Sequence, residues 1–175
     1  MQVIVSDIDG TVLDVEPRIA AVLNELGVER PAGEAIRVSR ALTGKQRDRF
    51  YDLFLSNKYL HLDQPIPAAV EQIGALQHET GLPLVYLSGR LANMSRETLA
   101  ALTELGLPFE TALLRPLRQR MMRTDRWKVS AIREHSYEPL HIFDDDSAIL
   151  AALGEAFPDA ALYDLSGPPA APGGG

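Results

Sequence analysis

The chain has 175 residues, 46 % of them hydrophobic and 23 % charged, a length and composition typical of one globular domain with a small lobe attached. It has no cysteine, which excludes disulfides, thiolate metal sites and cysteine nucleophiles and favours a cytoplasmic location. The net charge of −7 argues against general binding to nucleic acid or to an anionic membrane. No apolar run approaches the ~20 residues that span a bilayer, so we expect no membrane association.

The first predicted strand covers residues 1–7, and the stretch 12–66 that follows it departs from the rhythm of the rest of the chain. Helical spacing of apolar residues predicts helices over 19–26, 33–42 and 45–59. Since a segment of this length is too long for a plain loop in a compact domain, we predict a helical insert, or small cap, over 12–66. The alternative is that these helices pack directly on the sheet.

After residue 66, strand-length and helix-length segments alternate. Short apolar runs predict further strands over residues 83–89, 109–116, 139–146 and 159–165. Between them, helical periodicity predicts helices over residues 67–80, 91–105, from Thr124 or Asp125 to about His135, and 148–156. The strands lack polar alternation, as in parallel sheets that are buried on both faces. We therefore predict an α/β fold, a Rossmann-like open parallel sheet with helices on both sides.

This organisation assigns residues 1–11 and 67–166 to the α/β core. The last residues, 167–175, read GPPAAPGGG and are predicted to be disordered, because they have no means of burying apolar surface.

Polar side chains follow three of the predicted strands at the points where they end. Asp7 and Asp9 follow the first strand, residues 88–90 (Ser-Gly-Arg) the second, and three aspartates at 144–146 the fourth. Lys128 stands at the start of the intervening helix. Since the carboxyl ends of parallel strands meet at one edge of a sheet, we expect these groups to converge there.

Five carboxylates at one edge would repel each other and raise each other's pKa values unless a cation lies between them. A hard divalent cation such as Mg²⁺ suits this oxygen-rich set. One carboxylate would be free to attack phosphorus, and its neighbour two residues on to transfer protons. Ser88 would hydrogen-bond phosphoryl oxygens, and Lys128 and Arg90 would neutralise charge in the transition state. Gly10 would give the backbone room for a tight turn.

The motifs resemble those of the haloacid dehalogenase (HAD) superfamily, which is dominated by Mg²⁺-dependent phosphohydrolases with an aspartyl-phosphate intermediate. DIDGT at 7–11 resembles its first signature, YLSGR its second, RWKVSAI its third and IFDDD its fourth, all in family order. The resemblance covers about residues 2–165, apart from the insert.

The resemblance implies a role for each matching residue. Asp7 would be the nucleophile and a metal ligand, and Asp9 the general acid and base that also binds the metal through its carbonyl oxygen. Asp145 would be the third metal ligand and Asp144 would support it, although these two can be exchanged; Asp146 would cap the next helix. Ser88 and Lys128 would complete the catalytic set. The substrate-binding set would be Gly10, Thr11, Gly89 and Arg90.

The motifs indicate that the substrate is a phosphate ester, but they do not identify it, and three alternatives remain. We expect a small phosphorylated metabolite or nucleotide. The LSGR sequence and the basic segment 115–128, with six basic residues and one acidic residue, resemble the phosphatase domain of polynucleotide kinase/phosphatases, where the arginine reaches the phosphate. Polynucleotide or nucleotide 3′-phosphatase activity is therefore the second hypothesis. The third is a phospholigand-binding regulator without catalysis, since a fold alone does not fix function.

Overall fold

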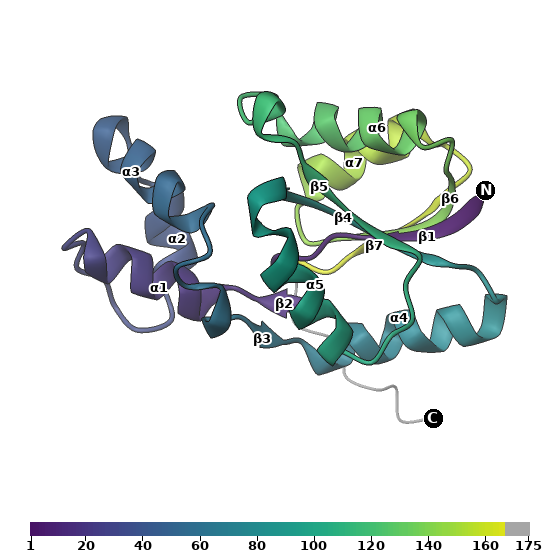
Figure 1. The fold of residues 1–175 in the computed structure, drawn as a ribbon, viewed down its shortest axis with the longest axis horizontal. Helices are drawn as coiled ribbons and strands as arrows, with labels where there is room; N and C mark the ends of the chain where they lie inside the picture. Colours follow the sequence, from purple (N-terminus) through teal and green to yellow (C-terminus); the bar gives the residue numbers. More distant parts are fainter. Residues whose placement is uncertain (167–175) are drawn as a thin grey trace.

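The computed structural model describes residues 1–166, so the tail predicted to be disordered lies outside the described part. Its centre is a five-stranded parallel sheet with the strand order β5-β4-β1-β6-β7 (Figure 1). The strands are β1 (Gln2–Ser6), β4 (Leu84–Leu91), β5 (Thr111–Arg115), β6 (Glu138–Asp144) and β7 (Ala161–Asp164). The predicted Rossmann-like α/β architecture is confirmed, and each of the five predicted strands is present.

Strand register brings the functional motifs to one edge. Ser6 at the end of β1 lies beside Tyr86 of β4 and Phe143 of β6. The residues that follow in each strand therefore emerge together: Asp7 after β1, Ser88 within the last part of β4, and Asp144 at the end of β6.

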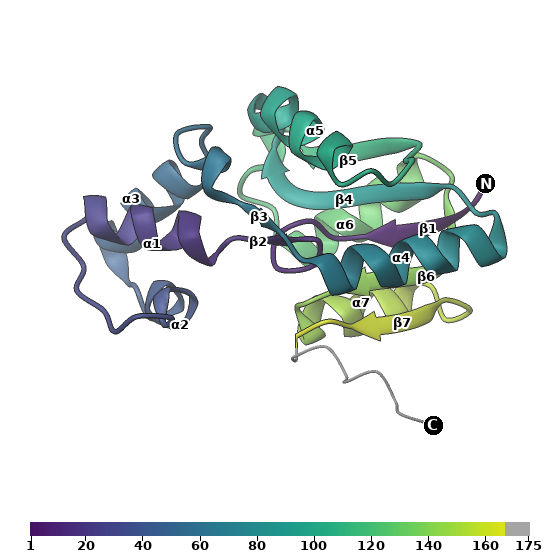
Figure 2. The same ribbon diagram turned by 90° about the horizontal axis from the view of Figure 1, so that it is seen from below.

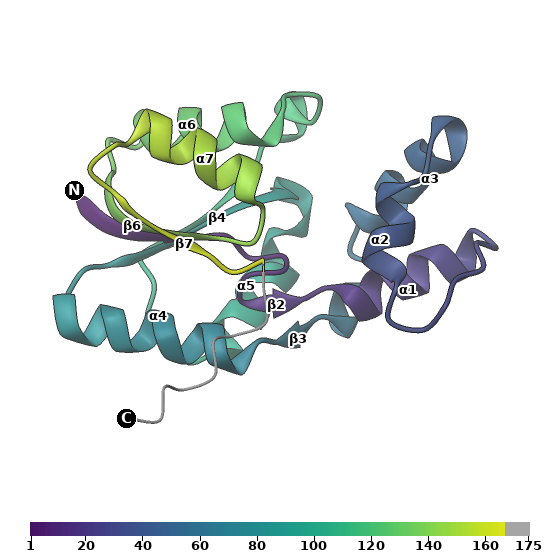
Figure 3. The same ribbon diagram turned by 180° about the vertical axis from the view of Figure 1, so that it is seen from behind.

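Helices cover both faces of the sheet, as Figures 1 and 3 show. The helices α6 (Thr124–Glu134) and α7 (Ser147–Ala156) pack on one face, against buried residues such as Val5 and Ile142. The helices α4 (Pro67–Thr80) and α5 (Ser95–Glu104) pack on the other, against Ile4 and Phe143. Because consecutive strand residues face opposite sides, burial on both faces requires the unbroken apolar runs seen in the sequence.

Two helix starts differ in detail from the sequence expectation. Thr124 and Asp125 lie inside the first turn of α6, and the residue at the N-cap position is Arg123. Asp146 does cap α7, since its side chain accepts hydrogen bonds from the backbone N–H groups of Ala148 and Ile149. The segment predicted as a helix from residue 91 begins with the last residue of β4 and a short 3-10 turn, η2 (Ala92–Met94).

Three helices between β1 and β4 form a unit of their own beside the sheet. They are α1 (Glu16–Glu25), α2 (Ala35–Arg40) and α3 (Gly44–Phe54), which pack around buried residues including Ile19, Val22 and Phe50. An antiparallel pair, β2 (Leu13–Asp14) and β3 (Gln64–Pro65), connects this helical unit to the core (Figure 2). The sequence pattern did not predict this two-residue pair.

The bounds of these helices also differ from those predicted. Pro17 in the first turn lets α1 start three residues before the predicted position 19, because proline is compatible with the first turn of a helix. The third helix ends at Phe54, and a 3-10 turn, η1 (Leu60–Leu62), follows it. Within residues 1–166, no helix has both the length and the apolar character needed to cross a bilayer.

Candidate active site

A buried lysine joins two aspartates at the carboxyl edge of the sheet. The Lys128 Nζ donates to Asp7 Oδ1 and to Asp144 Oδ2, at 2.6 Å in each case. The lysine comes from the first turns of α6, and the two acids come from the ends of β1 and β6. All three side chains are at least nine-tenths buried. Three motifs that are distant in the sequence therefore meet in one hydrogen-bonded group.

Asp145 completes a group of three carboxylates with Asp7 and Asp144, and one ligand atom from each lies within 4.8 Å of the others. Both oxygens of Asp144 are in use, because Oδ2 accepts from Lys128 and Oδ1 accepts from the backbone N–H of Asp146. Asp145 has only a 3.3 Å hydrogen bond from the Thr11 hydroxyl. Three clustered carboxylates suit a hard divalent cation, and Asp145 is the acid whose oxygens are least engaged.

Electrostatics at this group favour bound cations. Burial raises the pKa of Asp7 well above its usual range, Lys128 opposes this, and the neighbouring aspartates raise it further. Burial and the adjacent Asp144 raise the pKa of Asp145 to about 6. For Lys128, the two carboxylates outweigh burial and raise its pKa. One lysine thus leaves an excess of negative charge that a divalent cation would neutralise.

Gly10 lies directly against this carboxylate group. Its φ of +81° is in the left-handed region, and a Cβ built there would lie 2.2 Å from Asp145 Oδ2. Glycine is therefore required both by the backbone conformation and by the position of the Asp145 carboxylate.

If this group holds a divalent cation such as Mg²⁺, we expect Gly10→Ala to displace Asp145 and to weaken that binding at least about tenfold, because a hard cation needs its oxygen ligands in place. Isothermal titration with Mg²⁺ measures this. Gly81→Ala, at another left-handed glycine (φ +67°) with nothing within 4 Å of its Cβ position, is the matched control. It should lose stability through backbone strain and keep its Mg²⁺ affinity; an equal loss of affinity in both variants would contradict the prediction.

Asp9 is turned away from the three carboxylates and is held by two arginines. Its Oδ1 accepts from Arg90 Nε at 2.8 Å and Nη2 at 2.6 Å, and it forms an ion pair with Arg18 Nη2 at 3.0 Å. Burial alone would raise the pKa of Asp9, but the guanidinium groups of Arg90 and Arg18 lower it to about 2. In this arrangement Asp9 is an ionised carboxylate.

The side chain of Arg90 forms its hydrogen bonds and ion pairs with other side chains of the protein. Besides Asp9, it pairs with Asp63 at 2.5 Å and donates to the Thr98 hydroxyl at 3.1 Å. Only 1 % of its surface is exposed, and it does not line the cavity described below. Direct contact between Arg90 and a phosphoryl group therefore stays a prediction, and the role seen here is to hold Asp9.

Arg18 and Asp63 belong to this network, and sequence reasoning did not identify them. Arg18 comes from α1 of the helical unit and is fully buried; it pairs with Asp63 at 3.0 Å and lies 4.2 Å from the centre of the Phe54 ring. Nothing in the sequence marked it out, since it precedes the predicted helix and matches no motif. Through this arginine, the helical unit contacts one of the two signature aspartates directly.

The second motif lies beside the first. Ser88 is fully buried in β4, and its hydroxyl oxygen accepts a hydrogen bond from the backbone N–H of Arg90 at 3.2 Å. The hydroxyl proton remains available to an added acceptor. At Gly89, a Cβ would lie 3.0 Å from Arg115 Nη2, so the missing side chain makes room for that guanidinium.

These residues open into a cavity of about 910 Å³ between the core and the helical unit. Asp7, Ser88, Lys128 and Asp145 line its core side. The helical unit contributes basic and aromatic side chains, namely Arg40, Arg47, Tyr51 and Phe54. An ion pair between Asp52 of α3 and Arg120 of the core crosses the same cavity. The volume suits a substrate of metabolite or nucleotide size.

Solved structures of haloacid dehalogenase-like proteins share this fold. A haloacid dehalogenase-like hydrolase from Streptococcus pneumoniae matches with a TM-score of 0.62 at 18 % identity, over 88 % of this chain and 80 % of that one. A phosphonoacetaldehyde hydrolase-like protein from Oleispira antarctica matches with a TM-score of 0.59 at 16 % identity, over 89 % of this chain and 69 % of that one.

A chain in the structure of the Pnkp1/Rnl/Hen1 complex matches with a TM-score of 0.62 at 13 % identity, over 93 % of this chain. The present chain spans 45 % of the length of that chain. Scans against protein-family models and curated proteins gave no match. At these identities the similarity concerns the fold, and the HAD resemblance inferred from the motifs is confirmed at that level.

Proposed function

We propose that this protein is a Mg²⁺-dependent phosphatase that hydrolyses a phosphomonoester of a small metabolite or nucleotide through an aspartyl-phosphate on Asp7. The observation that carries this proposal is the position of Asp7, which lines the cavity, accepts a hydrogen bond from Lys128 and groups with two further carboxylates. The HAD hydrolase fold supports it independently.

The proposed reaction has two steps, and the chain's own residues perform the chemistry of both. In the first, an oxygen of Asp7 attacks phosphorus, the bond to the leaving oxygen breaks, and Asp9 donates a proton to that oxygen. In the second, Asp9 accepts a proton from water, whose oxygen attacks the phosphorus and releases Asp7 and inorganic phosphate. Lys128 and the Ser88 hydroxyl stabilise the phosphoryl oxygens as charge develops.

The arrangement of Asp9 fits the second step, because an ionised carboxylate is the form that accepts a proton. For the first step, Asp9 must bind a proton and turn from Arg90 and Arg18 toward the leaving oxygen. Since Arg18 belongs to the helical unit, we propose that residues 12–66 act as a cap whose position is coupled to Asp9.

Mg²⁺ fits the carboxylate group by the chemistry of its donors. Asp7 and Asp145, with Asp144 in support or in exchange, would hold the ion, and the carbonyl oxygen of Asp9 stays a predicted ligand. When bound, Mg²⁺ would neutralise charge on the carboxylates and on the phosphoryl group.

The test is release of inorganic phosphate from a panel of sugar phosphates, nucleotides and an aryl phosphate. We expect turnover in Mg²⁺, loss of turnover in EDTA, and recovery when Mg²⁺ is restored. Retained turnover in EDTA would contradict the metal assignment. If no ester were hydrolysed in Mg²⁺, the third hypothesis, a phospholigand-binding regulator, would replace the phosphatase.

Polynucleotide 3′-phosphatase activity is the second candidate, because arginines line the cavity and the fold resembles a chain of an RNA repair complex. For this candidate, 3′-phosphorylated oligonucleotides in the same panel would be the best substrates, and their KM would rise steeply with salt. Indifference to such ends, with good turnover of a sugar phosphate, would exclude it. The cysteine-free composition agrees with a cytoplasmic enzyme in either case.

A further inference from the structure

Arg115 is a buried guanidinium without an acidic partner. It ends β5, only 7 % of its surface is exposed, and no ion pair among residues 1–166 includes it. Its Nη1 donates to the backbone carbonyls of Arg120 and Met122 at 3.3 and 3.1 Å, and its Nη2 to the Thr124 hydroxyl at 2.6 Å. The buried Nε has no acceptor.

The other two buried arginines at this edge are different. Arg18 and Arg90 both pair with Asp9 and Asp63, so their charges are compensated inside the protein. Burying a charge without an opposite charge is costly, and an unsatisfied donor adds to that cost. The surroundings of Arg115 therefore call for an anion that the described chain does not supply.

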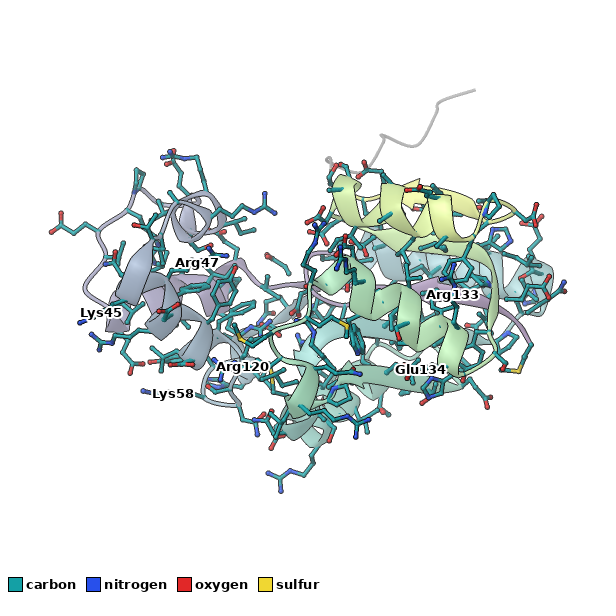
Figure 4. The ribbon with its side chains drawn as sticks, turned by 90° about the horizontal axis from the view of Figure 1, so that it is seen from above. Lys45, Arg47, Lys58, Arg120, Arg133 and Glu134 are labelled. Carbon is teal, nitrogen blue, oxygen red and sulfur yellow. The ribbon has the colours of Figure 1, made fainter. Side chains whose placement is uncertain are left out.

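The position of Arg115 indicates where that anion comes from. Its guanidinium packs over Gly89 of the second motif and lines the same cavity as Asp7 and Lys128. Across the cavity, Arg40 and Arg47 of the helical unit also have no carboxylate partner in residues 1–166. Figure 4 shows Arg47 on the helical unit and Arg120 on the core segment opposite.

Arg115 and Asp7 lie at the ends of strands that are not neighbours in the sheet. Asp7 follows the central strand β1, whereas Arg115 ends the edge strand β5, and β4 lies between them. Two strand spacings separate the backbones of β1 and β5 by roughly 10 Å. Lys128 and Ser88 already lie beside Asp7. Arg115, Arg40 and Arg47 add three further cations to the lining of the same cavity, more than one phosphoryl group needs and suited to a second anionic group on the same ligand.

We infer that Arg115 and Arg47, with Arg40 nearby, form a second anion subsite, and that the substrate is a phosphomonoester that carries another phosphate group. This inference rests on the proposed function, since it assigns the substrate class of the same site. A sugar bisphosphate, a nucleoside bisphosphate and the phosphodiester next to a 3′-phosphorylated end all supply this chemistry.

Binding to the Asp7→Asn protein in Mg²⁺, measured by calorimetry, tests the inference without turnover. The probes are alkanediol bisphosphates of two, four and six carbons, each compared with the alkyl monophosphate of the same length. We expect at least one bisphosphate to bind about tenfold or more tightly than its monophosphate, because each arginine adds charge-assisted hydrogen bonds to the second phosphate. A sugar bisphosphate, a nucleoside 3′,5′-bisphosphate and a 3′-phosphorylated dinucleotide, measured in the same way, distinguish the three natural sources.

Two pairs of variants locate the subsite. Arg115→Gln and Arg47→Gln should each reduce the preference for the bisphosphate and leave monophosphate affinity within about twofold. Arg118→Gln, three residues along the same segment, and Arg49→Gln, on the same helix, are exposed controls outside the cavity and should keep the preference. If Arg115 only braced the 116–123 loop, its variant would weaken both ligands equally. Because Arg47 is exposed on α3, Arg47→Gln should fold normally. The test therefore stays decisive even if Arg115→Gln does not fold.

The result that overturns the inference is the absence of any bisphosphate preference at all three lengths. The inference would also be overturned if Asp7→Asn alone and Asp7→Asn combined with Arg115→Gln or Arg47→Gln showed an equal preference for the bisphosphate. Failure of the proposed function has a different signature: the wild-type protein would release no phosphate from any ester in Mg²⁺, whatever the binding data show.

Discussion

Asp7→Asn is expected to abolish Mg²⁺-dependent release of phosphate from an aryl phosphate, lowering kcat by at least about 1,000-fold. The amide has the size of the carboxylate, but it cannot form the proposed acyl phosphate with phosphorus. Steady-state kinetics with protein at high concentration measures the residual rate. Asp159→Asn, the same chemical change at an exposed position outside the cavity, should leave kcat unchanged.

The same variant separates a catalytic role from a structural one. Because burial and neighbouring acids raise the pKa of Asp7, folding disfavours its ionised form. A neutral amide removes that cost, so the metal-free melting temperature of Asp7→Asn should not fall below that of the wild type. Retained turnover in this variant would contradict the assignment of Asp7 as nucleophile.

Much of the fold could be predicted because the strands carry a strong local signal. A parallel strand buried on both faces, such as Leu84–Leu91, must present apolar residues at successive positions, and the sequence shows this directly. The β2–β3 pair gave no such signal. Two residues per strand are too few for a periodic pattern, and Pro65 in β3 reads as a turn residue.

The residues of the candidate site also include some that the sequence could place and some that it could not. Groups that directly follow strands, such as Asp7, Ser88 and Asp144, could be placed at one edge by topology alone. The direction of each side chain could not, and Arg90 illustrates this, since the structure directs it to Asp9. Arg18 and Asp63 reach the site from the helical unit, whose position depends on packing that no local pattern records.

The two aspartates of the first motif have different neighbours. Asp7 has a lysine and two more acids around it, while Asp9 has two guanidinium groups. The first environment raises a carboxyl pKa and the second lowers it. Two acids two residues apart thereby acquire different protonation behaviour, and the proposed roles require both to change: a bound cation must favour the ionised form of Asp7, and Asp9 must leave the two arginines to bind a proton.

Lys128→Met should be the most destabilising single change at this site, lowering the free energy of unfolding by about 3–5 kcal/mol at neutral pH without metal. Lys128 is 2 % exposed and is the cation between Asp7 and Asp144, so its loss leaves two buried carboxylates uncompensated. Urea denaturation measures the loss. Lys45→Met, at an exposed position on α3, is the matched control and should change stability by less than about 0.5 kcal/mol.

The dependence on pH identifies the cause of this loss. Asp7 and Asp145 have raised pKa values in the folded protein, that of Asp145 being about 6, so they bind protons more readily when folded than when unfolded. Once protonated, they no longer need the lysine. The destabilisation caused by Lys128→Met should therefore be larger at pH 8 than at pH 5, and Mg²⁺ should reduce it at pH 8 by supplying the missing positive charge. A loss that is the same at both pH values and insensitive to Mg²⁺ would mean that Lys128 stabilises the fold by packing alone, and that the three carboxylates do not form a cation site.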